Sequence, residues 1–445
     1  MAHFRVGELD GVSLEMDKWK IILENAGHDV YYVAGTLGSS DGYKIPELGL
    51  DYEPSLKIFK NAFIELSDYE TAYDFKKEIQ LIVEKTKLKL QKFIDRHKIE
   101  FIIPNNIFSL PLNISATIAL YQVIDSNRLH GVSHNHDFYW ESRKYNPTIP
   151  LIQQYLDHLF PPVDLPLLKH VVINRLAQKQ LKERKNIEST VVPNVFYFSE
   201  PPWKIDNFNR DLREKIGVGE NDILVLQATR VVKRKGIELA IDLIHELNKP
   251  KNLSKLREKP LYNGRQFNNK IIFILPNLIE DTDYAEKLET KLRKFKIKYS
   301  FCNEYFASER TSTPRKRYSL WDSYVHADLV TYPSLHEGWG NQFLEAVKAK
   351  LPIILYEYDV YKSDIGCEGF KTISFGSNIV DKDKDGLVSV SSEIMERAAE
   401  ETIRVLTEPI FREKMVEQNF QVGLEKFSLR ALAKYIQPLI PSSLS

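Results

Sequence analysis

Cysteine and long apolar runs are scarce in this sequence. Of its 445 residues, only Cys302 and Cys367 are cysteines, which excludes a disulfide framework and a cysteine-rich zinc site. No apolar run approaches the roughly 18 residues of a membrane-spanning helix. The segment from Met1 to Glu8 also lacks the apolar core of a signal peptide. We therefore expect a cytoplasmic protein without a membrane span.

An excess of charge of one sign is also missing. The 61 lysines and arginines balance 61 aspartates and glutamates. General nucleic-acid binders neutralise phosphates with an excess of cations, so we expect no nucleic-acid partner. The chain is too long for one hydrophobic core, and its length predicts two domains of about 200 residues each.

Short apolar strands alternate with helical patterns along both halves of the chain. This order is typical of a parallel sheet, so the sequence predicts an α/β fold. Expected strands include residues 4–7, 29–34, 100–104, 169–174, 222–229, 270–275, 327–332 and 351–356, and residues 190–195 close the first half. Irregular segments are expected at 39–60 and 249–269, and helices at 318–326, 391–406, 409–426 and from about 428. The linker-like composition of residues 199–204 predicts a domain boundary near residue 198.

The stretch from Tyr332 to Lys350 predicts a strand end, a glycine loop and a helix. Glu337 is expected to project from the loop, and Glu345 to lie one turn into the helix. The backbone amides that would open this helix belong to Gly340, Asn341 and Gln342. Such a helix opening attracts anions, above all phosphates. A carboxylate on each side of an anion site would fit a sugar nucleotide.

A second cationic turn follows the buried strand at 222–229. Arg230 and Lys235 lie five positions apart across this turn and could hold a diphosphate from two sides, or could simply form an exposed cationic turn. The basic segment 310–317 is expected to be a mobile surface loop, with a phosphate lid as the alternative.

Candidate ligand-binding residues of the first half follow its strands. Open α/β sheets bind ligands at the carboxyl ends of their strands. The candidates at such positions are Gly11, Ser13, Asn105, His136 and Asp137. For Gly11 and Ser13, an ordinary βα turn without a ligand is an equal alternative. The first turn lacks the G-x-G-x-x-G spacing of dinucleotide-binding folds, which argues against a nicotinamide cofactor.

Two apparent metal-binding patterns are incomplete. His130, His134 and His136 have no acidic or cysteine partner at ligand spacing, so we expect no metal there. The segment 381–386 resembles a calcium loop but has Ser392 at the twelfth place, where a glutamate is needed, so a polar turn is expected.

Four of these segments together resemble a known family. Residues 333–345 resemble the E-x7-E segment of the retaining GT-B glycosyltransferases of family 4. Residues 229–236 are similar to the Arg-x4-Lys-Gly turn of that family, and residues 192–194 to its interdomain segment. His136 and Asp137 resemble its acceptor-side histidine and the residue beside it. The first turn, residues 10–13, departs from the family because it has no glycine pair.

The resemblance implies two Rossmann-like domains that face each other across a cleft. It assigns residues 1–198 to an acceptor-binding domain and residues 199–426 to a donor-binding domain. Residues 427–445 would form a last helix that packs back on the N-terminal domain.

The resemblance also implies roles for the site residues. Arg230 and Lys235 would hold the diphosphate and stabilise the charge of the leaving nucleotide. Glu345 would bind the ribose, Glu337 the donor sugar, and His136 the sugar near its reacting carbon. The loop residues Gly338, Gly340, Asn341 and Gln342 would complete the donor site, and Gly11, Ser13, Asn105 and Asp137 the acceptor site.

The implied activity is hexosyl transfer with retention, from a nucleotide-diphosphate sugar to a small, soluble acceptor. No cofactor and no metal would be required. Similarity of residues 11–20 and 134–141 to a subgroup linked to mannosylglucosyl-phosphoglycerate synthesis adds a glycerate-type acceptor to the candidates. The alternatives are a nucleotide-sugar epimerase or a phosphorylase of the same fold, and a non-catalytic sugar-nucleotide-binding protein.

Overall fold

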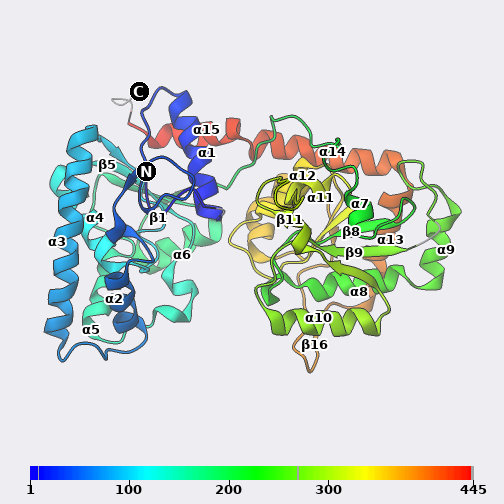
Figure 1. Cartoon of the computed structure of the whole chain (residues 1–445), viewed down its shortest axis with the longest axis horizontal. Helices are drawn as coiled ribbons and strands as arrows, with labels where there is room; N and C mark the ends of the chain where they lie inside the picture. The colour runs from blue at the N-terminus through cyan, green and yellow to red at the C-terminus, as the bar shows by residue number, and fades with distance from the viewer. Residues whose placement is uncertain (9, 268–269, 442–445) are drawn as a thin grey trace. The chain divides into compact units, whose positions relative to one another are not determined.

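The structure, a computed structural model, describes residues 1–8, 10–267 and 270–441 (Figure 1). The chain forms two compact units, the first made of residues 1–195 and 429–445 and the second of residues 196–428. Within the described residues, every helix is too short or too polar to cross a membrane.

Parallel strands form the centre of the first unit. Its two sheets have the orders β1-β2-β3 and β4-β5-β6-β7. A parallel bridge between Ala2 and Pro104 joins them into one layer, because the Ala2 amide donates to Ile103 at 2.9 Å. The strands are β1 (Ala2–Arg5), β2 (Val33–Thr36), β3 (Tyr43–Lys44), β4 (Phe101–Ile102), β5 (His130–Asn135), β6 (Leu168–Val172) and β7 (Ser189–Val191).

Helices cover this layer. They are α1 (Gly11–Asn25), α2 (Glu53–Phe63), α3 (Ala72–His97), α4 (Ile114–Asn127), α5 (Pro150–Leu159), α6 (Arg175–Lys185) and α15 (Leu429–Ile436). Although α15 lies at the end of the chain, it packs beside α1 (Figure 1). Its residues Leu432 and Ile436 belong to the same buried cluster as Val6 and Trp19.

The second unit has one six-stranded sheet of order β10-β9-β8-β13-β14-β15, in which every pair is parallel. Its strands are β8 (Ile223–Leu226), β9 (Ile271–Leu275), β10 (Lys298–Phe301), β13 (Leu329–Tyr332), β14 (Ile353–Leu355) and β15 (Ile373–Ser374). The central strands β8 and β9 are entirely apolar because helices cover both faces of the sheet. Two small sheets pair β11 (Phe306–Ala307) with β12 (Tyr318–Ser319), and β16 (Asp381–Lys382) with β17 (Val388–Ser389).

Helices α8 and α10 lie on one face of this sheet and α12 and α14 on the other (Figure 1). The helices of the unit are α7 (Leu212–Lys215), α8 (Ile237–Leu247), α9 (Pro250–Glu258), α10 (Thr282–Lys294), α11 (Leu320–Tyr324), α12 (Asn341–Lys348), α13 (Ser392–Thr407) and α14 (Pro409–Lys426). The predictions of an α/β fold with parallel sheets and of the closing helices are confirmed.

Three secondary-structure predictions were wrong. The segments 39–60 and 249–269, expected to be irregular, contain the start of α2 and all of α9. Each helix begins at or beside a proline (Pro54 and Pro250), which suits the first turn of a helix because that turn leaves its amides without helical partners. The helix expected at 318–326 starts only at Leu320, after strand β12 and a capping box of Ser319 with Asp322.

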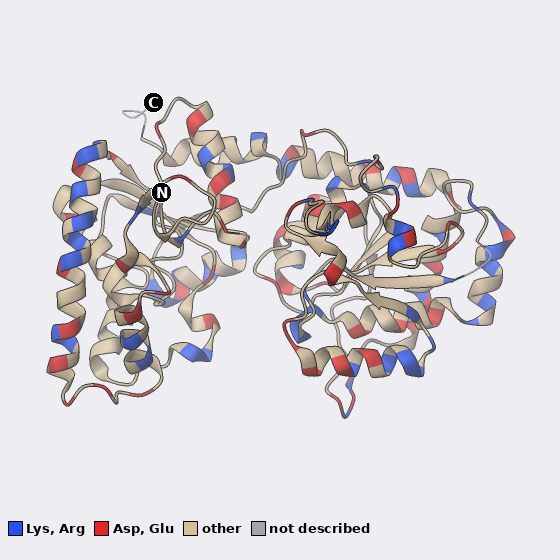
Figure 2. Ribbon diagram, in the orientation of Figure 1, with Lys and Arg blue, Asp and Glu red and all other residues tan. Residues whose placement is uncertain are grey.

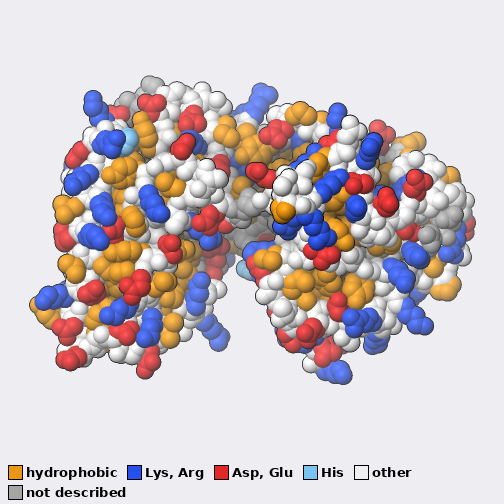
Figure 3. All heavy atoms as spheres, in the orientation of Figure 1, with side chains coloured by type: hydrophobic (Ala, Val, Ile, Leu, Met, Phe, Trp, Pro, Cys, Tyr) orange, Lys and Arg blue, Asp and Glu red, His pale blue; other side chains and the backbone are white. Residues whose placement is uncertain are grey.

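Lysines on α3 illustrate how charge is distributed. Lys85 and Lys89 lie 2.9 and 2.7 Å from a carboxylate oxygen of Glu47, whose side chain is 2% exposed. Basic and acidic residues recur along this helix (Figure 2), and on the face drawn in Figure 3 charges of both signs are interspersed. Two of the α3 lysines therefore anchor the preceding segment of their own unit.

Candidate functional site

The cationic turn 230–236 and the loop that carries Glu337 meet at one edge of the sheet of the second unit. Strands β8 and β13 are parallel neighbours, so the segments that follow them start at the same edge. The Leu335 amide donates to the Arg234 carbonyl at 2.9 Å. Gly236 has a φ of +57°, and a Cβ there would lie 2.4 Å from the Pro333 carbonyl oxygen. Only glycine fits this close approach of the two loops.

Glu337 binds two cations of the neighbouring turn. Its Oε2 accepts from Nη1 of Arg234 at 2.5 Å, and its Oε1 accepts from Nζ of Lys235. Glu337 and Lys235 are 8% and 3% exposed. The structure thus brings the predicted residues Lys235 and Glu337 together and adds Arg234, which the sequence analysis did not identify. Its position beside Lys235 in a three-residue cationic run was the available signal.

The pKa values of this cluster follow from burial and mutual charge. Burial raises the pKa of Glu337, but Lys235 and Arg234 outweigh it, so the pKa lies below its ordinary value. Burial also lowers the pKa of Lys235, and the Glu337 carboxylate offsets part of this effect. Glu337 is therefore ionised at neutral pH and is suited to accept hydrogen bonds.

Arg230, the other predicted diphosphate ligand, lies on the rim of the same turn. Its Nη1 is 2.5 Å from Oε1 of Glu280, and its side chain is 46% exposed. The charge of Arg230 also contributes to the lowered pKa of Lys235. Arg230 thus faces solvent, whereas Lys235 is the buried cation of the turn.

The glycine loop leads into α12 as expected. Gly338 lies in the loop, Gly340 immediately precedes the helix, and Asn341 and Gln342 begin it. A Cβ at Gly340 would lie 2.7 Å from Oη of Tyr358. This hydroxyl donates to the carbonyl of Trp339 at 2.8 Å. The hydrogen bond fixes the glycine loop to the segment that follows strand β14.

Glu345 lies on α12, whereas Glu337 lies in the loop that precedes this helix. Its Oε2 accepts a hydrogen bond from Oη of Tyr324 at 2.7 Å. Tyr324 is 1% exposed. Burial and the neighbouring Glu345 raise the pKa of Tyr324 well above its ordinary value, so it remains a donor. The sequence analysis did not identify Tyr324, because nothing in its local pattern points to a residue 21 positions away.

In the first unit, His136 and Asp137 follow strand β5 and are held by Asn106. The Oδ1 of Asn106 accepts from the His136 amide at 2.7 Å and lies 3.4 Å from the Asp137 amide. Asn106 has a φ of +53°, a conformation that asparagine tolerates better than most residues. The predicted residue Asn105 is instead fully buried and faces inwards. Its Nδ2 donates to the Ile103 carbonyl, and its Oδ1 lies 3.1 Å from Nδ1 of His134.

The histidines next to this loop are neutral. The rings of His134 and His136 lie 4.0 Å apart, and His136 is 6% exposed. Burial lowers the pKa of His134 to about 3 and, together with neighbouring charges, lowers the pKa of His136 well below its ordinary value. Within the described residues, Nε2 of His136 has no hydrogen-bond partner. A neutral imidazole with such a nitrogen can bind a hydroxyl group.

The first turn places Gly11 and Ser13 in the opening of α1. Asp10 caps this helix, since its Oδ1 accepts from the amides of Val12 and Ser13 at 3.0 and 3.2 Å. The Ser13 hydroxyl donates to Oδ2 of Asp10 at 2.9 Å, and Ser13 is 1% exposed. Gly11 is exposed, whereas the Ser13 hydroxyl is used inside the unit.

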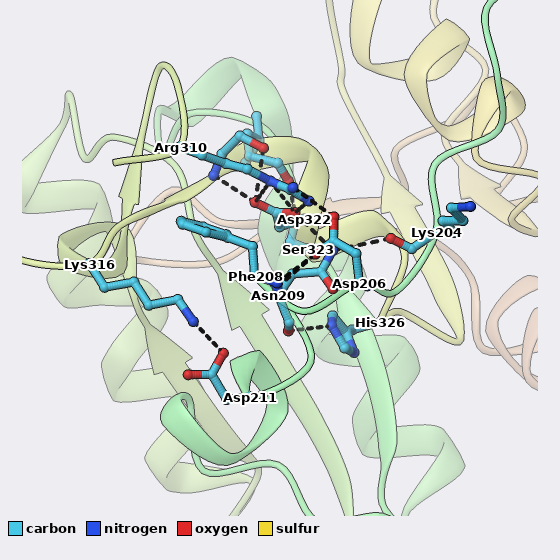
Figure 4. Close-up of polar contacts among 12 residues, drawn as sticks. Lys204, Asp206, Phe208, Asn209, Asp211, Arg310, Lys316, Asp322, Ser323 and His326 are labelled. Carbon is cyan, nitrogen blue, oxygen red and sulfur yellow. Dashed lines mark hydrogen bonds and ion pairs between the residues drawn. The ribbon is translucent and has the colours of Figure 1, made fainter. Parts of the chain in front are cut away.

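Ion pairs tie the basic segment 310–317 at two points (Figure 4). Arg310 lies 2.7 Å from Oδ2 of Asp206 and 2.5 Å from Oδ1 of Asp322. Lys316 lies 2.6 Å from Oδ1 of Asp211. Among the residues described by the structure, no group of three or more histidines, cysteines or acidic residues is arranged to hold a metal ion.

No protein-family profile matches the sequence. The mannosylglucosylglycerate synthase of Petrotoga mobilis is 38% identical over 441 residues, which cover 98% of this chain and 99% of that protein. The mannosylglucosylglycerate synthase of Thermotoga maritima is 38% identical over 97% of both chains. The chain belongs to the mannosylglucosylglycerate synthase family. It is therefore a glycosyltransferase, as predicted.

Solved structures agree on the fold of this family member. A glycosyltransferase from Rickettsia africae superposes with a TM-score of 0.61 at 12% identity and covers 99% of both chains. The predicted GT-B fold, with two Rossmann-like domains, is confirmed. The epimerase, phosphorylase and non-catalytic alternatives gain no support from these relatives.

Proposed function

We propose that the protein transfers a mannosyl group from a nucleotide-diphosphate mannose to glucosylglycerate, with retention of anomeric configuration. The observation that carries this proposal is the 38% identity, over nearly the whole chain, to two mannosylglucosylglycerate synthases. Their name describes a product in which mannose is joined to glucosylglycerate.

The second unit, with the predicted boundaries 199–426, is proposed to bind the donor. Lys235 and Arg230 contact the diphosphate and neutralise the charge that develops on it. Arg234 joins them, because it shares the Glu337 carboxylate with Lys235. Glu337, ionised and fixed by two cations, accepts hydrogen bonds from hydroxyls of the donor sugar.

Helix α12 is proposed to bind the rest of the nucleotide. Gly338, Gly340, Asn341 and Gln342 bring backbone amides to the opening of this helix, where the helix dipole favours phosphate. Glu345, further along the same helix and partly exposed, accepts hydrogen bonds from the ribose hydroxyls.

The first unit, with the predicted boundaries 1–198 and the returning segment 427–445, is proposed to bind the acceptor. His136 contacts the sugar near its reacting carbon, and Asp137 lies beside it. Gly11 contributes backbone at the start of α1, after the turn that follows β1. Ser13 and Asn105 support the site from within, because their side chains bond to neighbouring groups of the unit.

The proposed reaction takes place on one face of the sugar. The bond between the anomeric carbon and the β-phosphate oxygen breaks, and its electron pair leaves with the nucleoside diphosphate. An acceptor hydroxyl forms a new bond to the same carbon from the same side, and its proton passes to the leaving phosphate oxygen. This route needs no protein nucleophile, and Arg230, Arg234 and Lys235 supply positive charge without a metal ion.

The test is an assay of purified protein with GDP-mannose and glucosylglycerate, in which nucleotide release and product are followed. UDP-mannose, UDP-glucose and ADP-glucose serve as alternative donors, and chelator is included to test metal independence. NMR of the product should show an α-linkage if the donor is an α-mannoside. A β-linked product would refute retention, and no turnover with any mannosyl donor would refute the assigned substrate.

Phosphorylated glucosylglycerate is a second acceptor to include. Its motivation is the similarity of residues 11–20 and 134–141 to a subgroup linked to the phosphorylated compound. A kcat/KM higher for the phosphorylated acceptor than for glucosylglycerate would place the chain's preference with the phosphorylated form.

A further inference from the structure

We propose that Tyr324 is a positioning residue that fixes the carboxylate of Glu345 for recognition of the donor ribose. This inference rests on the proposed function, in which Glu345 binds the ribose hydroxyls. The inference adds Tyr324, which lies on α11 whereas Glu345 lies on α12, to the proposed ribose site. It also predicts that the site prefers ribose to deoxyribose.

The contact itself is short and sheltered. Oη of Tyr324 donates to Oε2 of Glu345 at 2.7 Å, and Tyr324 is 1% exposed whereas Glu345 is partly exposed. A hydrogen bond from a hydroxyl to a carboxylate is among the stronger ones in proteins. Glutamate has three rotatable side-chain bonds, so an unrestrained carboxylate on α12 would adopt several orientations. The tyrosine selects one of them.

Helix α11, which carries Tyr324, is itself firmly placed. Its capping box pairs Ser319 with Asp322, and Arg310 binds both Asp322 and Asp206 (Figure 4). Asn209 also donates to Oδ1 of Asp322 at 2.9 Å. A five-residue helix would be marginal alone, and these charged contacts hold it in register.

Stacked aromatic rings hold the other side of α11. Trp321 and Trp203 stack with ring centroids 4.9 Å apart and an angle of 15°, and the Trp203 ring lies 5.9 Å from that of Tyr324. Trp321 and Tyr324 are three positions apart and so share one side of the helix. Tyr324 is therefore fixed by packing and by the start of its helix before it fixes Glu345.

This arrangement gives the tyrosine a role that depends on the nucleotide. A carboxylate held in one orientation can accept from both vicinal hydroxyls of a ribose. Removal of one of these hydroxyls leaves a site group without its partner, which is the basis of strong discrimination. The side chain that orients Glu345 then contributes to the preference for ribose, while the diphosphate contacts of Lys235 stay unchanged.

The experiment compares binding of GDP with that of 2′-deoxy-GDP by calorimetry, and that of UDP with that of 2′-deoxy-UDP if a uridine donor gives turnover. Tyr324→Phe removes one oxygen and keeps the ring. We expect the affinity ratio of ribose to deoxyribose nucleotide to fall by about fivefold to tenfold, with deoxynucleotide affinity nearly unchanged. In Glu345→Ala this affinity ratio should fall to about one, and the double variant Tyr324→Phe/Glu345→Ala should have the same ratio as Glu345→Ala.

Tyr262→Phe is the matched control. Tyr262 also donates to a carboxylate, that of Asp328 at 3.1 Å, but Asp328 precedes strand β13 and thus lies at the opposite edge of the sheet. The ratio in this variant should equal that of the wild type. Thermal unfolding reports whether each variant folds, and Glu345→Asp, which draws the carboxylate back from Tyr324, provides a second test with the tyrosine intact.

The outcomes separate the two proposals. If Glu345→Ala loses the ribose preference and Tyr324→Phe retains it, the positioning role is overturned and the function of Glu345 stands. If Glu345→Ala keeps the ribose preference, the assignment of Glu345 to the ribose fails and the positioning role fails with it. An unchanged ratio in Glu345→Asp also overturns the positioning role.

Discussion

The two candidate sites, one in each unit, are built from opposite kinds of chemistry. In the second unit, ionised side chains dominate, with Glu337 bound to Arg234 and Lys235. In the first unit, the neutral amide of Asn106 and the uncharged ring of His136 lie beside a carboxylate of the predicted site, that of Asp137. This difference in charge is consistent with the proposed assignment, in which the second unit binds the diphosphate of the donor and the first unit binds the acceptor. Fixed positive charge suits a diphosphate, and the neutral groups around His136 can exchange hydrogen bonds with sugar hydroxyls.

The largest effect is expected from Lys235→Ala. Loss of this buried ammonium removes charge stabilisation of the leaving diphosphate, and kcat/KM should fall by about 100- to 1000-fold. The control is Lys233→Ala, which removes an exposed lysine of the same turn. Near-normal turnover of Lys235→Ala, with the fold intact by circular dichroism, would contradict the donor-site assignment.

A smaller effect, confined to the acceptor, is expected from Asn106→Ala. Without Oδ1, the His136 amide loses its partner, which should lower stability by about 1–3 kcal/mol and kcat/KM for the acceptor by about tenfold. Asn106→Gly keeps the positive φ accessible and separates backbone conformation from side-chain bonding. Equal increases in the KM values for donor and acceptor would contradict the prediction, because they would show that the two sites do not act independently.

Arg234→Ala should shift the acid limb of the pH–rate profile. Burial raises the pKa of Glu337 and the two cations lower it below its ordinary value. Removal of Arg234 should therefore raise this pKa, move the acid limb to higher pH and reduce kcat/KM at neutral pH by about tenfold. Arg234→Lys keeps the charge and should show a smaller shift.

The same depressed pKa makes a prediction for stability. Because Glu337 has a lower pKa when folded than when unfolded, its stabilising contribution is present above the unfolded pKa and is lost as pH falls through the folded pKa. Arg234→Ala brings the folded pKa of Glu337 closer to the unfolded one, so denaturant unfolding at a series of acidic pH values should show a smaller loss that is complete at a higher pH. An identical pH dependence in both proteins would show that Arg234 does not govern the Glu337 charge.

The smallest effect is expected from His136 titration. Burial keeps the pKa of this histidine well below its ordinary value, so kcat/KM for the acceptor should be nearly flat from about pH 6 to pH 8. A clear inflection within this range that disappears in His136→Asn would show that His136 carries charge during turnover, and the contrast between the two sites would no longer hold.

The sequence predicted those features that depend on local pattern. Buried apolar runs such as 270–275 predicted the strands, and glycine and cation spacing predicted the loops that follow β8 and β13. The segments 39–60 and 249–269 were expected to be irregular, but they contain helix starts at or beside Pro54 and Pro250. Asn106, Arg234 and Tyr324 were missed because their roles arise from contacts with residues 30, 103 and 21 positions away. Such contacts are set by tertiary packing, which leaves no periodic trace in the chain.

The position of α15 has a consequence for synthesis on the ribosome. This helix is translated near the end, yet Leu432 and Ile436 complete the buried cluster that also holds Val6 and Trp19. The second unit, 196–428, is therefore fully translated and able to fold while the first unit still lacks part of its interior. A nascent chain stopped before Leu429 should bind a chaperone or be cut by protease in its first 195 residues, and release of the last segment should remove that sensitivity.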